Sequence, residues 1–246
     1  MTYCVAIKLE EGLVLMSDTR TNAGVDNISR FRKMYTWEIP GNRAIATLSS
    51  GNLSITQGVI NRVSAAIKRS ETGEETETIL NAPTMFRVAQ LIGQTMREMQ
   101  DRYRETLIEQ GAGADALILV AGQINGGDHR IFMVYSAGNF IEATEDTPFF
   151  QIGEHKYGKP ILDRVITPAT PISEALKAAF LSMDSTIRSN LSVGMPLDLA
   201  VIPEGRYSFS TRRRIEADDT DWQAMSAGWA TAIREGFSQL PEVDLG

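Results

Sequence analysis

The order in which strand-like and helix-like segments follow one another constrains the fold of this chain more than any single motif does. The chain opens with short apolar runs over 3–9 and 13–17 that flank a charged pair and Gly12, a pattern typical of a β-hairpin. A second hairpin is expected over 33–48, where Lys33 opens another apolar stretch. The chain therefore begins with two antiparallel strand pairs before any helix.

Helices and strands then alternate in pairs along the rest of the chain. Periodicity predicts these elements in order: helices near 52–69 and 84–109, strands near 115–122 and 130–136, helices near 155–167 and 172–188, strands near 197–202 and 206–213, and a helix near 219–237. Strand pairs that alternate with helix pairs are typical of two antiparallel sheets covered by helices. The sequence therefore predicts an α+β fold in a single domain over 1–246.

Residue 2 carries the chemistry that the sequence indicates. Thr2 directly follows Met1, and its small side chain permits removal of Met1, which would leave Thr2 with a free α-amino group. A threonine hydroxyl is a weak nucleophile that needs an adjacent base, and an N-terminal amine can supply one. Because an α-amino group titrates near ~7.7–8.0, it can accept and return a proton at working pH. Thr2 is a candidate nucleophile, although a threonine at this position more commonly just begins a strand.

Two charged residues are expected to lie beside Thr2. A tight turn at 10–12 makes the second strand antiparallel to the first, so that Asp18, just past the end of that strand, returns towards Thr2. Lys33 opens the next strand and can reach the same edge. A lysine anchored by an aspartate would lower the cost of deprotonating the hydroxyl. Taken singly, Asp18 is more typical of a turn and Lys33 of a solvated surface.

These residues belong to a longer pattern that resembles the opening of a proteasome β-subunit, an N-terminal nucleophile (Ntn) hydrolase. The pattern runs from Thr2 through Gly12-Leu13-Val14-Leu15-Met16-Ser17-Asp18-Thr19-Arg20 and Ala23-Gly24 to Lys33, with one residue fewer than usual before the lysine. The chain is most similar to the bacterial ancestral β-subunit group, Anbu, notably over 17–28. This resemblance implies a four-layer αββα sandwich, two antiparallel sheets flanked by helix pairs.

The resemblance also implies a role for each matching residue. Thr2 would be the nucleophile and its amine the base, Asp18 would orient Lys33, Lys33 would tune the hydroxyl, and Arg20 would brace the loop. The turn over 48–52 falls where the family stabilises the oxyanion of the tetrahedral intermediate with a backbone N–H. By register the donor would be Ser50 or Gly51. The same turn is also typical of a helix N-cap, for which Ser50 and Asn52 are both suitable residues. The turn can be a helix cap and supply the oxyanion donor at the same time.

The sequence departs from the family at the polar residues expected around the amine. Glu154 stands where proteasome β-subunits have a serine beside the threonine amine. In the stretch over 187–194, Ser192 matches the family's serine, but Ser189 or Asn190 stands in place of its aspartate. A different proton route, an unusual substrate or low activity on ordinary peptides could each follow, and the sequence does not rank them.

Composition excludes several classes of site. A single cysteine, Cys4, rules out an internal disulfide framework and a cysteine metal cluster, and two histidines give little basis for a histidine triad or metal site. No cofactor and no metal are expected, and Cys4 is interpreted as a packing residue. The net charge of −7 argues against nucleic acid as a partner. Without a stretch of 18 apolar residues or a leader, the chain is expected to be cytoplasmic, with no membrane partner.

The expected partners are other copies of the chain and a peptide or protein substrate. Proteasome-like subunits assemble through repeated head-to-tail contacts, so the resemblance implies a homo-oligomeric ring or helical assembly. Trp222, Met225, Trp229 and Ile233 form one apolar stripe on the last helix. The stripe is expected to face the core, with a subunit interface as the alternative. An ATP-dependent partner is compatible with the family, and no residue pattern indicates one.

Two alternative functions remain open on the sequence. The chain could be an Ntn amidohydrolase that acts on a small amide, because such an enzyme would share the same chemistry. It could also be a non-catalytic scaffold subunit that has kept the fold. The presence of Thr2, Asp18 and Lys33 together favours an enzyme.

Overall fold

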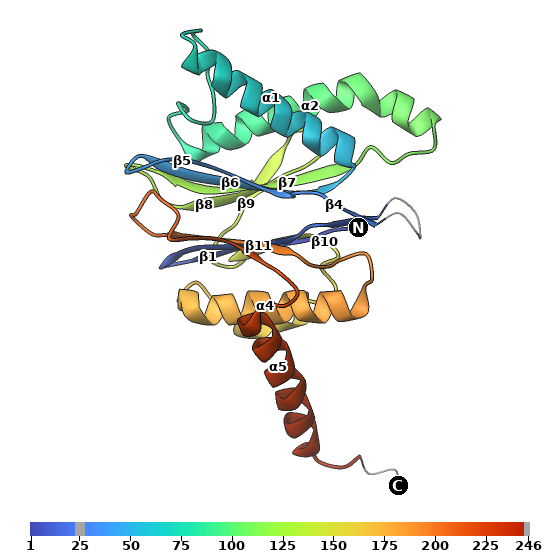
Figure 1. Cartoon of the computed structure of the whole chain (residues 1–246). Helices are drawn as coiled ribbons and strands as arrows, with labels where there is room; N and C mark the ends of the chain where they lie inside the picture. Colours follow the sequence, from blue (N-terminus) through green and yellow to red (C-terminus); the bar gives the residue numbers. More distant parts are fainter. Residues whose placement is uncertain (23–27, 244–246) are drawn as a thin grey trace.

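Two five-stranded antiparallel sheets form the centre of the protein in a computed structural model that describes residues 1–22 and 28–243 (Figure 1). The first sheet has the strand order β10 (Phe149–Gly153), β1 (Tyr3–Leu9), β2 (Gly12–Asp18), β11 (Leu197–Pro203) and β12 (Thr211–Ile215). The second has the order β5 (Met34–Ile39), β6 (Arg43–Gly51), β7 (Ala116–Ile124), β8 (Arg130–Val134) and β9 (Phe140–Glu142). A short ribbon pairs β3 (Arg20–Asn22) with β4 (Ile28–Arg30).

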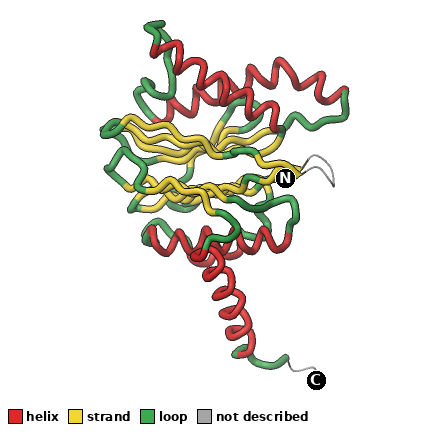
Figure 2. Tube along the Cα trace, viewed as in Figure 1, coloured by secondary structure: helices red, strands yellow, loops and turns green. Residues whose placement is uncertain are grey.

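Helices cover the outer face of each sheet, so that the molecule has four layers (Figure 2). On the β5–β9 sheet lie α1 (Leu53–Glu71) and α2 (Met85–Glu109), and on the other sheet lie α3 (Lys159–Val165) and α4 (Ile172–Ser189). The predicted αββα sandwich is therefore confirmed. Over the described part of the chain, no helix has an apolar stretch long enough to cross a bilayer.

The strands of the inner layers are apolar on both faces because each sheet is buried on both sides. In β1, Val5 and Ile7 pack towards α4, whereas Cys4 and Ala6 pack against the opposite sheet. This alternation is the period of two that a strand imposes. Alanines occur repeatedly between the two sheets, and Cys4 is fully buried among them as the packing residue that the sequence predicts.

The predicted first hairpin is present and sets the position of the site. β1 and β2 pair in a register that places Cys4 opposite Ser17 and Leu9 opposite Gly12. Gly12 has a φ of 137°, and a Cβ built there would lie 2.2 Å from the Ile202 carbonyl oxygen, so this turn requires glycine. Asp18 is the last residue of β2 rather than the residue after it, and it lies beside the start of β1.

Two predicted boundaries are wrong for identifiable reasons, and some short strands were not predicted. The helix expected over 155–167 begins only at Lys159, because Pro160 fits the first turn of a helix and not its interior. The strand expected over 206–213 begins at Thr211, after a loop in which Tyr207 has a φ of 50°. β9 was not predicted because three residues are too few for a periodic pattern, and β10 was not predicted because Phe149 and Phe150 are adjacent and break the alternation of a strand.

The last helix, α5 (Thr220–Ser238), projects away from the four layers beyond α4 (Figure 1). Only Trp222 at its start is buried, where it packs on Phe180 of α4. Met225 and Trp229 are half-buried, and Ile233 is 50% exposed. The expectation that this stripe faces the core is therefore wrong beyond its first residue, because the helix runs off the body of the protein.

Candidate functional site

The three residues that the sequence singles out come together at one edge of the sheets. Thr2 directly precedes β1, Asp18 ends β2 and Lys33 directly precedes β5, so three separate strands place them. All three are buried, with exposed fractions of 8%, 0% and 3%. The Lys33 ammonium lies 2.6 Å from Oδ1 of Asp18. The structure thus places an ion pair beside the residue proposed to react.

Backbone amides hold the Asp18 carboxylate in place. Oδ1 accepts a hydrogen bond from the backbone N–H of Tyr3 at 3.0 Å, and Oδ2 accepts one from that of Gly194 at 3.3 Å. Burial raises the pKa of the Asp18 carboxyl, and the Lys33 charge and these N–H groups oppose that rise. The bond from Tyr3 ties the carboxylate to the residue that follows Thr2.

The Lys33 ammonium uses all three of its N–H donors. Besides Asp18, it donates to the carbonyl oxygens of Arg20 at 2.6 Å and of Met1 at 3.3 Å. The last acceptor belongs to the peptide bond that joins Met1 to Thr2. Removal of Met1 would take this acceptor away and leave one donor of Lys33 directed at the new N-terminus.

The chain terminus sits in an environment that favours a neutral amine. Burial lowers the pKa of the Met1 α-amino group from its usual 8.0, and the nearby Lys33 charge lowers it further. Asp18 and Glu154 act in the opposite direction. By contrast, burial raises the pKa of the Cys4 thiol, which keeps it protonated and unreactive.

A cavity of about 1050 Å³ opens over Thr2. Lys33 and the segment 49–51 line it next to Thr2. Its walls are mostly apolar and are formed by Phe31, Leu53, Leu117, Met133 and Ile152. Thr21, Asp115, Tyr135, Gln151, Glu154 and His155 add polar groups. The cavity is large enough for several residues of an extended peptide, and most of its wall would receive apolar side chains.

The end of β6 lines this cavity with the segment that the sequence proposes as the source of the oxyanion donor, Ser50 or Gly51. The N–H of Ser49 donates towards β5, to the Lys33 carbonyl, whereas that of Asn52 donates to Asp115 on the β7 side. N–H groups alternate in direction along a strand, so the N–H of Gly51 points to the same side as that of Ser49. Lys33 lies on that side, next to Thr2. The direction of the N–H groups therefore favours Gly51 over Ser50 as a donor near Thr2.

Gly51 also makes the strand-to-helix turn possible. It has a φ of 96°, and a Cβ there would lie 2.2 Å from the Asp115 carbonyl oxygen. Asn52 is the N-cap of α1, and its side chain accepts from the N–H groups of Ser54 and Ile55. The two interpretations of this turn, as a helix cap and as a source of free N–H groups, are therefore compatible.

Glu154 lies against Thr2, at the position where the sequence departs from the family. Its backbone N–H donates to the carbonyl oxygen of Thr2 at 2.7 Å. The preceding Gly153, with a φ of 83°, packs so closely that a Cβ would lie 1.9 Å from the same oxygen. The Glu154 carboxylate raises the pKa of the N-terminal amine. A charged group thus acts where a neutral hydroxyl is usual in the family.

The segment over 189–194 reaches the site mainly through its backbone. Ser189 ends α4 and is exposed, and the Asn190 side chain accepts from the N–H of Ser192 within its own turn. None of the three lines the cavity over Thr2. Arg20 contacts this segment, because its guanidinium donates to the Leu191 carbonyl. The contact with Asp18 comes instead from the backbone of Gly194, which no sequence signal marks.

Ala23 and Gly24, part of the family pattern, lie outside the described residues. A family model of the proteasome subunit matches residues 2–202. Solved structures match nearly the whole chain: Anbu (ancestral beta-subunit) from Yersinia bercovieri has 43% identity and a TM-score of 0.91, with 99% of each chain covered. This chain belongs to the proteasome family, in its Anbu group.

Two further Anbu structures agree with this assignment. Anbu from Hyphomicrobium sp. strain MC1 has 45% identity and a TM-score of 0.90, with 99% of this chain and 100% of that chain covered. The helical assembly of the Anbu complex from Pseudomonas aeruginosa has 41% identity and a TM-score of 0.91, with 99% and 98% covered. A search of curated proteins found no significant match. The chain is thus a member of a proteasome-like Ntn protease family.

Proposed function

We propose that this proteasome-family chain is a threonine peptidase in which Thr2 becomes the nucleophile once Met1 is removed. The observation that carries the proposal is the buried Lys33 ammonium, held by Asp18 and Arg20 with its third donor on the Met1–Thr2 peptide bond. This buried cation lies at the bond that precedes Thr2. Its field would favour an ionised Thr2 hydroxyl.

The reaction would proceed through an acyl-enzyme. The Thr2 amine takes the hydroxyl proton as Oγ1 attacks the substrate carbonyl carbon, and the N–H of Gly51 donates to the resulting oxyanion. The amine then returns that proton to the leaving nitrogen as the C–N bond breaks. Water, deprotonated by the same amine, hydrolyses the ester and restores Thr2. No redox partner or metal is needed for this cycle.

The cavity supports a peptide as substrate rather than a small amide. Its volume of about 1050 Å³ exceeds what one small amide fills, and its apolar walls suit large side chains. We expect the best substrates to carry an apolar residue on the acyl side of the cleaved bond, because Phe31, Leu53 and Met133 lie around Thr2.

Self-assembly is the second part of the proposal. Anbu structures include a helical assembly, and α5 of this chain exposes an apolar face that its own body does not cover. Ile233 is 50% and Phe237 76% exposed on that helix. We propose that α5 contacts a second copy of the chain, so that Thr2 opens onto a partly enclosed surface.

Hydrolysis of fluorogenic peptides tests the enzymatic part. The wild-type chain should release the fluorophore from peptides with an apolar residue before the cleaved bond, and Thr2→Ala should release none. Thr2→Ala removes one hydroxyl and one methyl group before the first strand, so its thermal unfolding should match the wild type. Equal release by both proteins would contradict the proposal.

A further inference from the structure

Two carboxylates of the described residues line the cavity over Thr2, and they flank different parts of the proposed reaction. Asp115 lies beside Gly51, because a Cβ built on Gly51 would lie 2.2 Å from the Asp115 carbonyl oxygen. Glu154 lies beside Thr2, because its backbone N–H donates to the Thr2 carbonyl oxygen at 2.7 Å. Asp115 is therefore next to the proposed oxyanion donor, whereas Glu154 is next to the residue that would carry the reactive amine.

The leaving half of a peptide would lie close to that amine. In the proposed reaction, the Thr2 amine returns its proton to the leaving nitrogen as the C–N bond breaks. Direct proton transfer needs the two nitrogen atoms to be about 3 Å apart. The first residue after the cleaved bond carries the leaving nitrogen, and its side chain branches from the carbon atom bonded to that nitrogen. This side chain would therefore lie near Glu154, whereas the oxyanion would lie near Gly51.

The Glu154 carboxylate makes no ion pair within the described residues. Its charge acts on the N-terminal amine, whose pKa it raises, so it faces this part of the cavity. Among the described lining residues, Lys33 is the only lysine or arginine, and its ammonium is buried in the ion pair with Asp18. The Thr2 amine must be neutral to act as a base, so it does not compensate the carboxylate either.

A cationic side chain in the leaving half would supply the missing partner. We propose, as an extension of the function proposed above, that Glu154 selects peptides with lysine or arginine as the first residue after the cleaved bond. Glu154 is half-buried, so an ion pair formed there is screened less than one on the open surface. Complementary charge of this kind contributes mainly to specificity. The cavity would thus recognise an apolar residue before the cleaved bond and a basic residue after it.

Internally quenched peptides that differ only in the residue after the cleaved bond test this proposal. Lysine is compared with norleucine, which has a similar aliphatic chain without the ammonium. At low ionic strength we expect the wild type to favour lysine in kcat/KM by roughly fivefold or more, the upper end for a partly screened ion pair. In Glu154→Gln the advantage of lysine should fall below twofold. Because each ratio is taken within one variant, any effect of Glu154 on the amine cancels.

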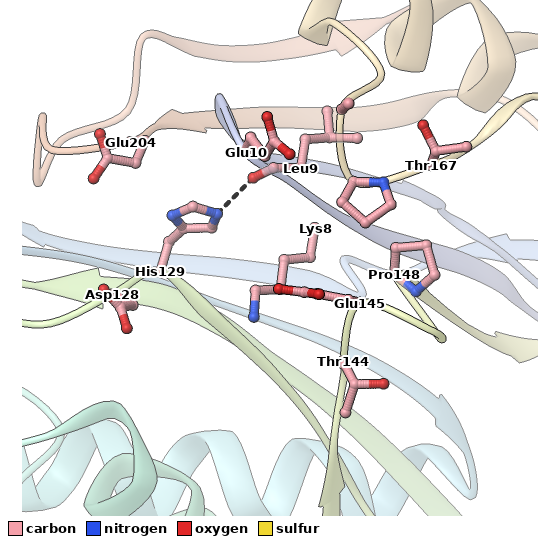
Figure 3. Close-up of a pocket in the computed structure, with 12 residues that line it drawn as sticks. Lys8, Leu9, Glu10, Asp128, His129, Thr144, Glu145, Pro148, Thr167 and Glu204 are labelled. Atoms are coloured by element: carbon pink, nitrogen blue, oxygen red, sulfur yellow. Dashed lines mark hydrogen bonds between the residues drawn. The ribbon is translucent and has the colours of Figure 1, made fainter.

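Two control variants remove a carboxylate elsewhere. Glu145→Gln makes the same chemical change in a different cavity of about 590 Å³, at the end of β10 away from Glu154 (Figure 3). The five residues of β10 separate the two glutamates by on the order of 15 Å. Asp115→Asn removes the other carboxylate of the cavity over Thr2. Both controls should keep the advantage of lysine, and its loss in either one would overturn the assignment to Glu154.

Binding to Thr2→Ala separates this proposal from the peptidase proposal. Fluorescence anisotropy with the same two peptides, labelled and uncleaved, should give a Kd at least threefold lower for lysine than for norleucine. Adding Glu154→Gln to Thr2→Ala should abolish this difference. Equal Kd values in Thr2→Ala, or equal kcat/KM values in the wild type, would overturn the selection by Glu154 while leaving the peptidase proposal in place. A wild type that cleaves neither peptide would contradict the peptidase proposal, and the Kd values would still decide this one.

Discussion

Replacement of Lys33 by methionine should separate a catalytic role of this residue from a structural one. The ammonium is buried, and its removal leaves the fully buried Asp18 carboxylate without its counter-charge. Loss of one partner of a buried ion pair costs about 3–5 kcal/mol. Asp18 keeps the N–H groups of Tyr3 and Gly194, so we expect the lower end of that range. For a chain of this size, that corresponds to a fall in Tm of roughly 6–12 °C.

The double variant Asp18→Asn with Lys33→Met supplies the control. It removes both charges, so it should recover at least half of the lost stability in thermal unfolding at one fixed protein concentration. Peptide hydrolysis should nevertheless stay at least ~10²-fold below the wild type in both variants, because the field on Thr2 is absent in both. If the double variant recovered activity together with stability, the role of Lys33 would be structural only. Turnover within tenfold of the wild type in Lys33→Met would make Arg32 the next candidate.

Three further predictions address the base, the oxyanion donor and the assembly. Glu154 raises the pKa of the Met1 amine and should act in the same direction on the Thr2 amine, which must be neutral to serve as base; the acid limb of kcat/KM should therefore move to lower pH in Glu154→Gln, and an unchanged or higher midpoint would contradict this. A Cβ at Gly51 would clash with the Asp115 carbonyl and displace the turn that carries the N–H, so Gly51→Ala should lower kcat by at least ~10²-fold while Ser50→Ala stays within threefold of the wild type; equal losses, or a loss of thermal stability that accounts for the fall in kcat, would remove the support for Gly51 as the donor. Phe237→Asp should reduce a homo-oligomer to a 27.1 kDa species in sedimentation, whereas a wild-type chain that is already an active monomer would refute the assembly proposal.

Much of the fold could be predicted because its strands and helices are long enough to show their periods. The hairpin of β1 and β2 has apolar runs on either side of a turn that only glycine permits, and α2 has a continuous apolar side. β9 is too short for any period to appear, and the adjacent Phe149 and Phe150 of β10 hide its alternation. For α5, the pattern showed an apolar side but could not show what covers it, so its departure from the body was missed.

The candidate site could likewise be predicted only in part from the sequence. Thr2, Asp18 and Lys33 could be singled out from the sequence because the β1–β2 hairpin returns Asp18 towards Thr2, and because Lys33 opens the next strand and completes the family pattern. The groups that were missed are backbone atoms: the N–H groups of Tyr3 and Gly194 and the carbonyl of Met1. Every residue has such groups, so only the folded geometry can distinguish these. The chemical roles assigned to the site residues stay predictions.

Mass spectrometry after treatment with a peptide epoxyketone tests the central claim most directly. This reagent forms a ring from both the hydroxyl and the free amine of an N-terminal threonine, so it reports nucleophile and processing together. We expect a chain that begins at Thr2 and gains one inhibitor mass, with the adduct on the N-terminal peptide and none on Thr2→Ala. An active chain that retains Met1, or an adduct on any other residue, would contradict it.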